Sequence, residues 1–333
     1  MENSTELTFT TAGTSSNEIG TKMESLPAYQ AGLLIWKIVP PLMLTFGTIG
    51  NVLSIMVLTK KSNRNNTSAL YLSTLAVSDL VSLYTGLLRQ WIIYMFNYDI
   101  RNIGFLICKI HLFFVYFSLD FSAWLLVAVT FDRVVKTCFP HVAKTTFTRK
   151  TAAISISTVG LVLLFLNCHV FYGMGTVATV TNYTTTVNEC TYLSVKYKKF
   201  FQTVWPWLDF AVYSCLPFLL LLTGNLVIIV RLFKSFKATH TAKNKISSTS
   251  CTLIILNTVF LMSTTPVSIF LIGYPYWSEN ASSNKMAALN LIWSFVNILM
   301  YTNNAINFLL YCLSGSKFRK ELKQIFQKCC KFK

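Results

Sequence analysis

Charged side chains are scarce in this chain of 333 residues, and acidic ones are fewer than half as many as basic ones. Charged residues make up 12% of the sequence, with 12 Asp and Glu, whereas 53% of the residues are hydrophobic and the mean hydropathy is +0.51. A soluble globular domain carries about a quarter charged residues. The composition therefore excludes an ordinary soluble domain and favours a protein whose solvent is lipid.

Clustered catalytic groups are also missing. The four histidines, at positions 111, 141, 169 and 240, are scattered, and the deep carboxylates Asp79 and Asp120 fall in different apolar stretches. The chain is therefore not expected to be an enzyme, and no organic cofactor is expected. A transporter or channel would show a line of ionisable groups or a repeat of broken helices, and neither is apparent. An intramembrane enzyme and a transporter or channel stay as the alternatives.

Long apolar stretches are what the sequence has in abundance. Each is longer than the ~20 residues that an α-helix, rising ~1.5 Å per residue, needs to cross ~30 Å of hydrocarbon. We therefore predict an all-α membrane protein, a bundle of seven transmembrane helices. The expected spans are Leu33–Thr59, Ala69–Met95, Phe105–Phe131, Thr151–Tyr172, Phe200–Leu232, Ile246–Ile272 and Met286–Tyr311.

Little sequence is left outside these spans. We expect an extracellular tail over residues 1–32, the seven-span domain over 33–312, and a cytoplasmic tail over 313–333 that forms an amphipathic helix on the membrane surface. Cys329 and Cys330 follow that helix, where palmitoylation would anchor it. The first residues do not resemble a cleavable signal, so the first span is expected to act as its own insertion signal.

The net charge of +17 is distributed unevenly. Lys and Arg crowd into the first, third and fifth connections and the carboxyl tail, which the positive-inside rule assigns to the cytoplasm. The amino terminus is therefore expected outside a plasma-membrane protein. A basic cytoplasmic face suits anionic lipid headgroups or an acidic cytosolic partner, and nucleic acid is not expected.

This topology divides the nine cysteines and the glycosylation sequons. Cys108 and Cys190 fall on the outer, oxidising side, so we expect a disulfide between them, with two free thiols as the alternative. A loop of about 80 residues closed this way contributes about 4 kcal/mol in the chain-entropy treatment. Asn3 and Asn182 head sequons on the same side and are the expected glycosylation sites.

Polar groups inside the spans need partners, because hydrocarbon offers none. Asp79 lies in the middle of the second span, and other spans carry amide and hydroxyl groups at comparable depth. These groups would form a pocket for a small hard cation such as Na⁺, or a network that only joins helices. The expected members are Asn51, Asp79, Ser122, Asn303, Asn304 and Asn307.

Two further features indicate movement. Asp132 and Arg133 close the third span, where the guanidinium has a choice of partners, and a solvated helix end is the simpler interpretation. Pro217 and Pro266 fall inside spans five and six, where each removes a helix hydrogen bond and permits a kink. Phe260, below Pro266, is placed to repack if span six moves.

Together these residues resemble the rhodopsin-like G-protein-coupled receptors, from about Leu33 to Cys330. The resemblance rests on order and spacing as much as on identity: Arg133 follows Cys108 by twenty-five residues. The Cys-Leu-Ser-Gly-Ser-Lys-Phe-Arg ending and the short cationic fifth connection look most like invertebrate neuropeptide receptors of the FMRFamide-like type. The matching signatures are Gly50-Asn51, Leu75-Ala-Val-Ser-Asp79, Asp132-Arg133-Val134, Pro217, Phe260 with Pro266, and Asn307-Phe-Leu-Leu-Tyr311 followed by Cys-Leu-Ser-Gly-Ser-Lys-Phe-Arg.

The resemblance implies a receptor that binds an extracellular ligand and activates a heterotrimeric G protein through movement of spans five, six and seven. The switch residues it implies are Asp132, Arg133, Phe260, Pro266 and Tyr311. Three positions depart from the family pattern. Phe308 replaces a proline, Thr264 an aromatic residue and Asn225 a tyrosine. The family uses these positions for switching, so the resemblance implies that the replacements affect how efficiently the receptor couples to its G protein.

The ligand class follows from what the outer half offers. A retinal-binding relative would have a lysine where Tyr301 stands, and an amine receptor an aspartate where Val115 stands. An aromatic mouth of mixed charge suits a peptide, with a non-peptide ligand as the alternative. Each polar residue taken singly is equally explained as a charge reaching for the interface. The expected ligand-binding residues are Arg89, Gln90, Val115, Asp209, Tyr274, Trp293 and Asn297.

Overall fold

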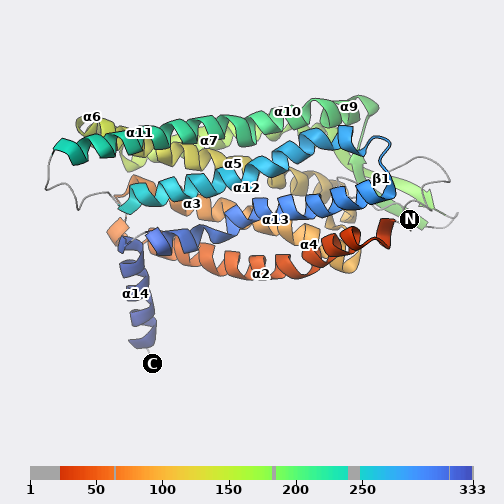
Figure 1. Cartoon of the computed structure of the whole chain (residues 1–333), viewed down its shortest axis with the longest axis horizontal. Coiled ribbons are helices and arrows are strands. Elements are labelled where there is room, and N and C mark those ends of the chain that lie inside the picture. The colour runs from red at the N-terminus through yellow and green to blue at the C-terminus, as the bar shows by residue number, and fades with distance from the viewer. Residues whose placement is uncertain (1–22, 64, 182–184, 239–247, 315, 332–333) are drawn as a thin grey trace.

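The computed structural model of the chain describes residues 23–63, 65–181, 185–238, 248–314 and 316–331. Long helices lie side by side along one axis (Figure 1). The second span is made of α3 and α4, and the fifth of α10 and α11. The helices of the bundle are α2 (Pro27–Leu58), α3 (Thr67–Ser82), α4 (Leu88–Phe96), α5 (Phe105–Cys138), α7 (Arg149–Asn167), α10 (Trp205–Asp209), α11 (Leu216–Ala238), α12 (Ser248–Ser278) and α13 (Ser283–Ser314).

Within the described residues, six helical segments are long and apolar enough to cross a membrane. The seventh span is α13, which is as long as α2 but carries buried amides such as Asn297, Asn304 and Asn307. These amides reduce its hydropathy because they face the interior of the bundle. The predicted seven-helix fold is confirmed.

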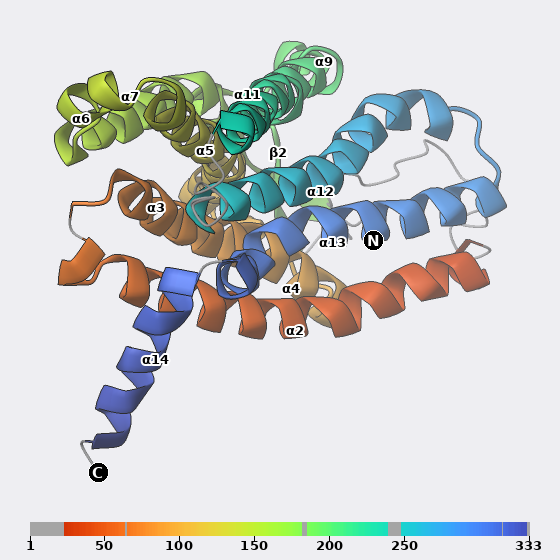
Figure 2. The same ribbon diagram turned by 60° about the vertical axis from the view of Figure 1, so that its left-hand side comes forward.

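The two ends of the bundle differ (Figures 1 and 2). We call the end where α2 begins the hairpin end, and the opposite end the α14 end. The hairpin end carries η3 (Ile100–Ile103), α8 (His169–Gly173), β1 (Met174–Thr181), β2 (Thr185–Tyr192) and α9 (Val195–Thr203). The α14 end carries η1 (Lys61–Asn63), α6 (Pro140–Thr146) and α14 (Ser316–Lys331).

A disulfide fastens the hairpin to the bundle. β1 and β2 pair antiparallel, with Thr176 opposite Cys190. Cys190 is bonded to Cys108 on α5, with 5.6 Å between the Cα atoms, and its backbone N–H donates to Asn102 Oδ1 over 2.9 Å. The predicted disulfide is therefore confirmed, and β2 is held against the top of α5.

Two spans are less regular than the apolar pattern predicts. Span two contains a π-helical turn, η2 (Leu83–Leu87), and the Tyr301 hydroxyl occupies the place where a Cβ atom of residue 86 would lie. The missing side chain lets α13 pack directly against this turn. Span five restarts at Pro206, the first turn of α10, and then passes through a second π turn, η4 (Phe210–Cys215). This turn precedes Pro217, which has no N–H to donate.

Phe308 explains why α13 continues without a break. A proline there would remove a backbone hydrogen bond, whereas Phe308 leaves α13 helical from Ser283 to Ser314. Its side chain fills the space beside Gly50 of α2, where an added Cβ atom would lie 2.8 Å from the Cβ of Phe308. Its ring also packs against Phe318 of α14, with 5.8 Å between centroids.

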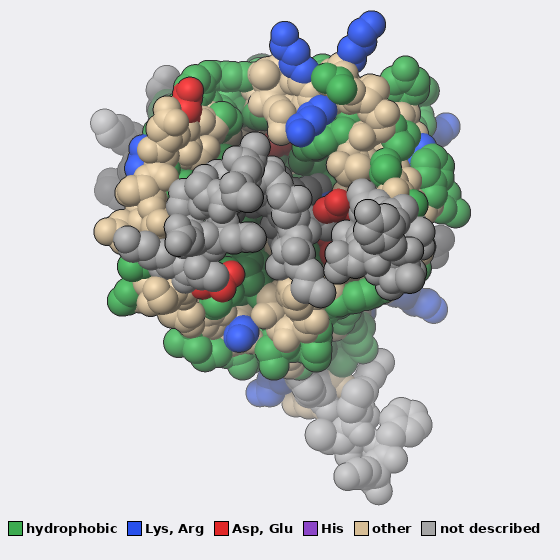
Figure 3. All heavy atoms as spheres, turned by 90° about the vertical axis from the view of Figure 1, so that its right-hand side faces the viewer, with side chains coloured by type: hydrophobic (Ala, Val, Ile, Leu, Met, Phe, Trp, Pro, Cys, Tyr) green, Lys and Arg blue, Asp and Glu red, His purple; other side chains and the backbone are tan. Residues whose placement is uncertain are grey.

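The flanks of the bundle are apolar and its interior holds the polar groups, the reverse of a soluble protein. Phe46, Phe165 and Met262 are each about 70% exposed, at 72%, 71% and 72%. Figure 3 shows hydrophobic side chains around the hairpin end, with basic and acidic groups among them. Such a surface requires an apolar solvent around it.

The amphipathic helix predicted after span seven is present as α14, which leaves the bundle at a steep angle (Figure 2). Its Phe318 is buried against Tyr311, and its Glu321 pairs with Lys60 over 3.1 Å. The expected glycosylation sites Asn3 and Asn182, and the side chains of the expected palmitoylation sites Cys329 and Cys330, lie outside the described residues.

Candidate functional site

Asp79 is fully buried at the centre of the bundle and joins three helices. Its Oδ1 accepts hydrogen bonds from Ser122 Oγ (3.0 Å) of α5 and from Asn304 Nδ2 (2.8 Å) of α13. Its Oδ2 accepts from Asn307 Nδ2 over 2.6 Å. Asn51 of α2 reaches the same place indirectly, because its Nδ2 donates to the Asn304 carbonyl over 2.9 Å.

The amide oxygens around Asp79 accept no hydrogen bonds, because, of these asparagines, only the amide nitrogens and the Asn304 backbone carbonyl take part in the contacts above. Asn51 Oδ1, Asn304 Oδ1 and Asn307 Oδ1 are buried and have no hydrogen-bond partner. Carbonyl and carboxylate oxygens are the ligands that hard cations prefer, so this donor set fits a small cation such as Na⁺. Asn303 is buried but has no hydrogen bond to Asp79 among the described contacts. The structure therefore brings together every expected member of the Asp79 network except Asn303.

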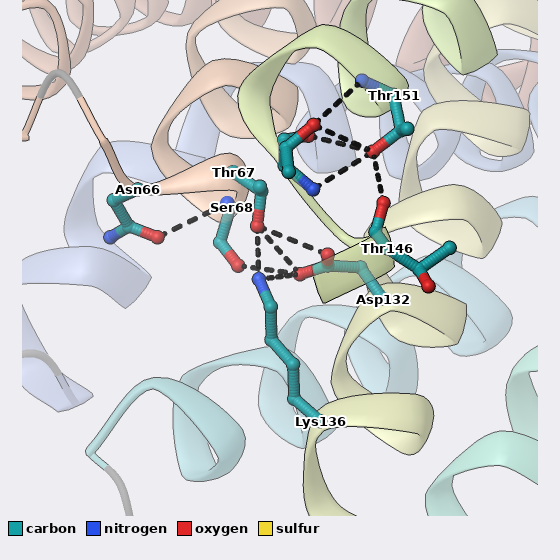
Figure 4. Close-up of polar contacts among 8 residues, drawn as sticks. Asn66, Thr67, Ser68, Asp132, Lys136, Thr146 and Thr151 are labelled. Carbon is teal, nitrogen blue, oxygen red and sulfur yellow. Dashed lines mark hydrogen bonds and ion pairs between the residues drawn. The ribbon is translucent and has the colours of Figure 1, made fainter. Parts of the chain in front are cut away.

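Asp132 joins α5 to the start of α3 at the α14 end (Figure 4). Thr67 Oγ1 donates to both carboxylate oxygens over 3.0 Å, and Ser68 Oγ donates to Oδ2 over 3.2 Å. Lys136, one turn further on α5, pairs with Oδ2 over 2.8 Å and also bonds Thr67. The carboxylate is therefore occupied by hydroxyls and a lysine.

Arg133 is not paired with its neighbour. Its Nε is buried and has no hydrogen-bond partner among the described residues. The sequence left two arrangements open, a bond to Asp132 or a reach across the bundle, and Asp132 is already bound by Thr67, Ser68 and Lys136. Next to the Asp132 contact, on the side of Thr67 and Lys136, lies a hollow of about 290 Å³. It is lined by Asn65, Asn66, Thr67, Lys136, Pro140, Ala143, Lys144 and Phe147.

A second polar junction holds α12 against its neighbours. Asn257 of α12 is fully buried, and its Nδ2 donates to Thr130 Oγ1 of α5 and to Asn225 Oδ1 of α11, both over 2.9 Å. The sequence flagged Asn225 only as a departure, and missed Asn257. The structure shows that the unusual amide on α11 has a partner amide on α12, which we call the Asn257 junction.

Phe260 and Pro266 lie in the described part of α12, as the sequence placed them. Phe260 is buried and packs edge-on against Tyr213 of η4, with 6.2 Å between centroids. Thr264, which stands where an aromatic residue was expected, turns its hydroxyl back to the Phe260 carbonyl over 2.8 Å. Such back-bonding favours bending of a helix, and Pro266, two residues further on, lies inside α12, which continues as one helix to Ser278.

At the hairpin end, Arg89 differs from the expectation. It is 3% exposed and not free in the mouth, because its guanidinium holds Asp99 by two hydrogen bonds, of 3.0 Å and 2.6 Å. Asp99 lies just before η3 and also accepts from the Arg101 N–H over 3.0 Å. The sequence missed this partner because Asp99 lies in a loop, ten residues from Arg89.

The charge of Asp99 is stabilised by this arrangement. Burial by itself raises the pKa of the carboxyl, but hydrogen bonding and charge from Arg89, together with those of Arg101, outweigh burial. The pKa of Asp99 therefore lies below its ordinary value of 3.8.

The other expected ligand residues lie near the same end. Trp293 of α13 and Tyr274 of α12 both pack on Phe270, each with 5.6 Å between centroids. Asn297 is buried and bonds the Trp293 carbonyl over 2.9 Å, while Gln90, Val115 and Asp209 are half-buried. The sequence missed Phe270, since nothing in its pattern separates it from an ordinary core phenylalanine.

Seven apolar spans, a carboxylate bound at their centre and a hairpin tied by a disulfide to the third span define a seven-transmembrane receptor. The family described as 7 transmembrane receptor (rhodopsin family) matches residues 50–311, and the chain belongs to it. It is accordingly a multi-pass plasma-membrane protein of a receptor family that signals through G proteins.

Individual relatives are distant but cover most of the chain. It is 24% identical to human C-C chemokine receptor type 1 over 88% of this chain and 80% of that receptor. It is 23% identical to CX3C chemokine receptor 1 of Rattus norvegicus, over 90% and 80%. It is 28% identical to C-C chemokine receptor type 3 of Macaca mulatta, over 89% and 81%. These relatives are chemokine receptors, whereas the ending after span seven and the short fifth connection suggested neuropeptide receptors.

We predict that Asn257→Ala raises basal G-protein activation. The substitution removes two buried hydrogen bonds that hold α12 against α5 and α11, worth about 2 kcal/mol together, or about thirtyfold in the equilibrium between closed and open bundles. The measurement is agonist-free activation of a G-protein reporter, normalised to receptor at the cell surface. Thr258→Ala is the matched control, because Thr258 is exposed on α12 and bonds only its own helix. Equal basal signals from both variants would contradict the assignment.

Arg89→Gln is expected to lower surface delivery and the Tm of the purified receptor. It leaves the buried Asp99 carboxylate without its cation, at a cost of about 3–5 kcal/mol. Arg89→Met combined with Asp99→Asn removes both charges, keeps the cap of η3 and should recover much of the loss. Lys285→Gln, an exposed cation at the same end, is the control.

The pH dependence follows from the lowered pKa of Asp99. A carboxyl with a depressed pKa stabilises the fold at pH values above its unfolded value of 3.8, and this contribution is lost as the pH falls through the folded value. The Tm difference between the original chain and the double variant should therefore shrink only below about pH 4. A difference that does not change with pH would rule out the ion pair as its source.

Proposed function

We propose that this chain is a receptor whose hairpin end faces outside and binds a peptide, and whose α14 end activates a heterotrimeric G protein. The orientation rests on charge: Lys60, Lys61, Lys144 and other cations gather at the α14 end, as the positive-inside rule requires of a cytoplasmic face. The observation that carries the proposal is the Asn257 junction, which closes α12 on α5 one turn before Arg133.

Signalling then depends on two polar contacts with different roles. Asp132 ties α5 to α3, and we infer that this contact stays fixed. The Asn257 junction ties α5 and α11 to α12, whose Pro266 and Thr264 favour bending. A ligand that prefers the open arrangement shifts the equilibrium in proportion to its differential affinity. We infer that opening α12 makes Arg133 accessible to a partner.

The ligand is proposed to be a peptide or small protein. The named relatives are receptors for chemokines, so chemokine-type ligands are the first class to test, and amidated neuropeptides the second. Gln90, Val115, Asp209 and Asn297 would contact it, together with the aromatic residues Tyr274 and Trp293. Arg89 would act through Asp99, by fixing the connection between spans two and three.

We also propose that Na⁺ binds at Asp79. Asp79 would supply the charge, and Asn51, Asn304 and Asn307 the carbonyl oxygens that have no other partner. Membrane lipids are the remaining proposed partners, through the basic face and through palmitoyl groups on Cys329 and Cys330. Glycans on Asn3 and Asn182 would agree with an outward hairpin end.

The signalling proposal is tested in cells that express the full chain with G-protein dissociation reporters. C-C and CX3C chemokines and a set of amidated neuropeptides are applied in turn. We expect at least one chemokine to give a saturable response, and Arg133→Ala to abolish it without lowering surface level. Lys150→Ala removes an exposed cation from the same end and should leave the response unchanged.

Silence of the original chain across both peptide sets, with no agonist-free signal and normal surface level, would count against a peptide receptor. A response to neuropeptides alone would replace the first ligand class by the second. Full activity of Arg133→Ala would remove that residue from the coupling surface.

The sodium proposal predicts that NaCl raises the Tm of purified receptor above its value in N-methylglucamine chloride of equal ionic strength. A specifically bound ion stabilises by about 1–3 kcal/mol at ten to a hundred times its Kd. Asp79→Asn should abolish the difference, whereas Thr302→Ala, whose hydroxyl bonds only its own helix, should keep it. An undiminished effect in Asp79→Asn would place the ion elsewhere.

A further inference from the structure

Two carboxylates in the outer half of the bundle are not used by the switch. Asp120 of α5 is 2% exposed, and Asp209 of α10 is half-buried. The sequence analysis named Asp120 only as a deep carboxylate, and Asp209 as one of the expected ligand-binding residues. In the structure the two lie at one level of α5 and span five. The two helices touch below this level, where Trp124 Nε1 donates to the Val212 carbonyl over 3.0 Å.

The geometry above them explains this proximity. Asp120 lies one turn below Tyr116 on α5, and Asp209 lies one turn below Trp205 on span five. Both helices run from the hairpin end inward, and the Tyr116 and Trp205 rings meet edge to face, with 5.6 Å between centroids. An aromatic pair therefore covers a pair of carboxylates. Tyr213, one turn deeper on span five, is buried.

Several polar atoms at this place have no partner. Asn167 of α7 is fully buried; its Nδ2 donates to Asp120 Oδ2 over 2.9 Å, but its own Oδ1 accepts nothing. Asp120 Oδ1 and Trp205 Nε1 are likewise buried without a hydrogen bond. Among the described residues, no Lys, Arg or His forms an ion pair with Asp120 or Asp209.

This arrangement is costly unless something else enters it. Two carboxylates in a low-dielectric interior repel each other, and each requires an opposite charge or a proton. Buried oxygens that accept nothing add to the cost. The backbone at Asp209 also passes into the π turn η4, an irregularity frequent at functional sites. Acids below and aromatic faces above are the surroundings that favour an organic cation.

We propose that Asp120 and Asp209, beneath Tyr116 and Trp205, form a subsite for an ammonium or guanidinium group. The carboxylates and Asn167 Oδ1 would accept its N–H groups, and the aromatic rings would cover its apolar stem. The inference rests on the proposed receptor function and names the chemistry of one part of its ligand. The subsite is distinct from the proposed sodium site, whose carboxylate Asp79 is bound by α5 and α13.

The test uses full-length receptor purified in lipid nanodiscs, without G protein. The probes are tritiated 2-phenylethylamine, which is cationic at neutral pH, and its uncharged counterpart 2-phenylethanol. We expect saturable binding of the amine and much weaker binding of the alcohol. Asp120→Asn and Asp209→Asn should each weaken the amine by about thirtyfold or more, the effect of removing one partner of a buried charge pair.

Glu279→Gln is the matched control, because it removes an exposed negative charge from the hairpin end and should leave the affinity unchanged. If Asp120→Asn does not yield folded receptor, Asp209→Asn decides the question, since its side chain is only half-buried. A lysine tripeptide and its uncharged norleucine counterpart are then tested as competitors of the amine. If only the lysine tripeptide displaces it, the cation that the subsite binds is a peptide side chain. Displacement by small amines alone assigns it to a free amine, and either result supports the subsite.

Equal binding of amine and alcohol, or undiminished amine binding in both variants, would overturn the proposal. Displacement by NaCl or CaCl₂ at equal ionic strength, more strongly than by N-methylglucamine chloride, would assign the carboxylates to an inorganic ion instead. The binding measurement does not involve G-protein activation. Failure of the proposed subsite can therefore be distinguished from failure of the proposed signalling function.

Discussion

The carboxylate of Asp79 is the constraint around which the bundle is arranged. An ionisable group in the middle of a membrane requires polar partners, and lipid supplies none. Ser122, Asn304 and Asn307 provide them from α5 and α13, and Asn51 joins α2 through the backbone of α13. Four spans are thereby held in one register, and the rest of the bundle packs around a fixed centre.

The departures from the family pattern are compensated locally, and each compensation has a physical form. Asn225 on α11 is matched by Asn257 on α12, so an unusual amide gains a partner instead of remaining unsatisfied. Phe308 fills the space beside Gly50 and contacts Phe318, so α13 continues as a helix where a proline would bend it. The residues at these unusual positions are therefore packed or hydrogen-bonded to a neighbouring helix.

Charge is arranged in layers along the bundle. An ion pair fixes the loop at the hairpin end through Arg89 and Asp99, two acids lie below an aromatic pair in the outer half, and Asp79 occupies the centre. At the α14 end Asp132 is bound by α3 and Lys136, while Arg133 is left with an unpaired nitrogen. Cations therefore gather at the α14 end, whereas these carboxylates lie within the bundle.

The sequence by itself determined the solvent, the number of spans, the disulfide and most partners of Asp79, because span length, charge placement and depth along a helix are one-dimensional properties. Only the tertiary structure decided that Arg89 is bound by Asp99, that Asn225 meets Asn257, and that Asp120 and Asp209 lie at one level beneath Tyr116 and Trp205. Those contacts depend on how each helix is rotated and where it is irregular. Glycine and proline positions, such as Gly86 and Pro217, set those irregularities, but only packing against a neighbouring helix fixes which side chains meet.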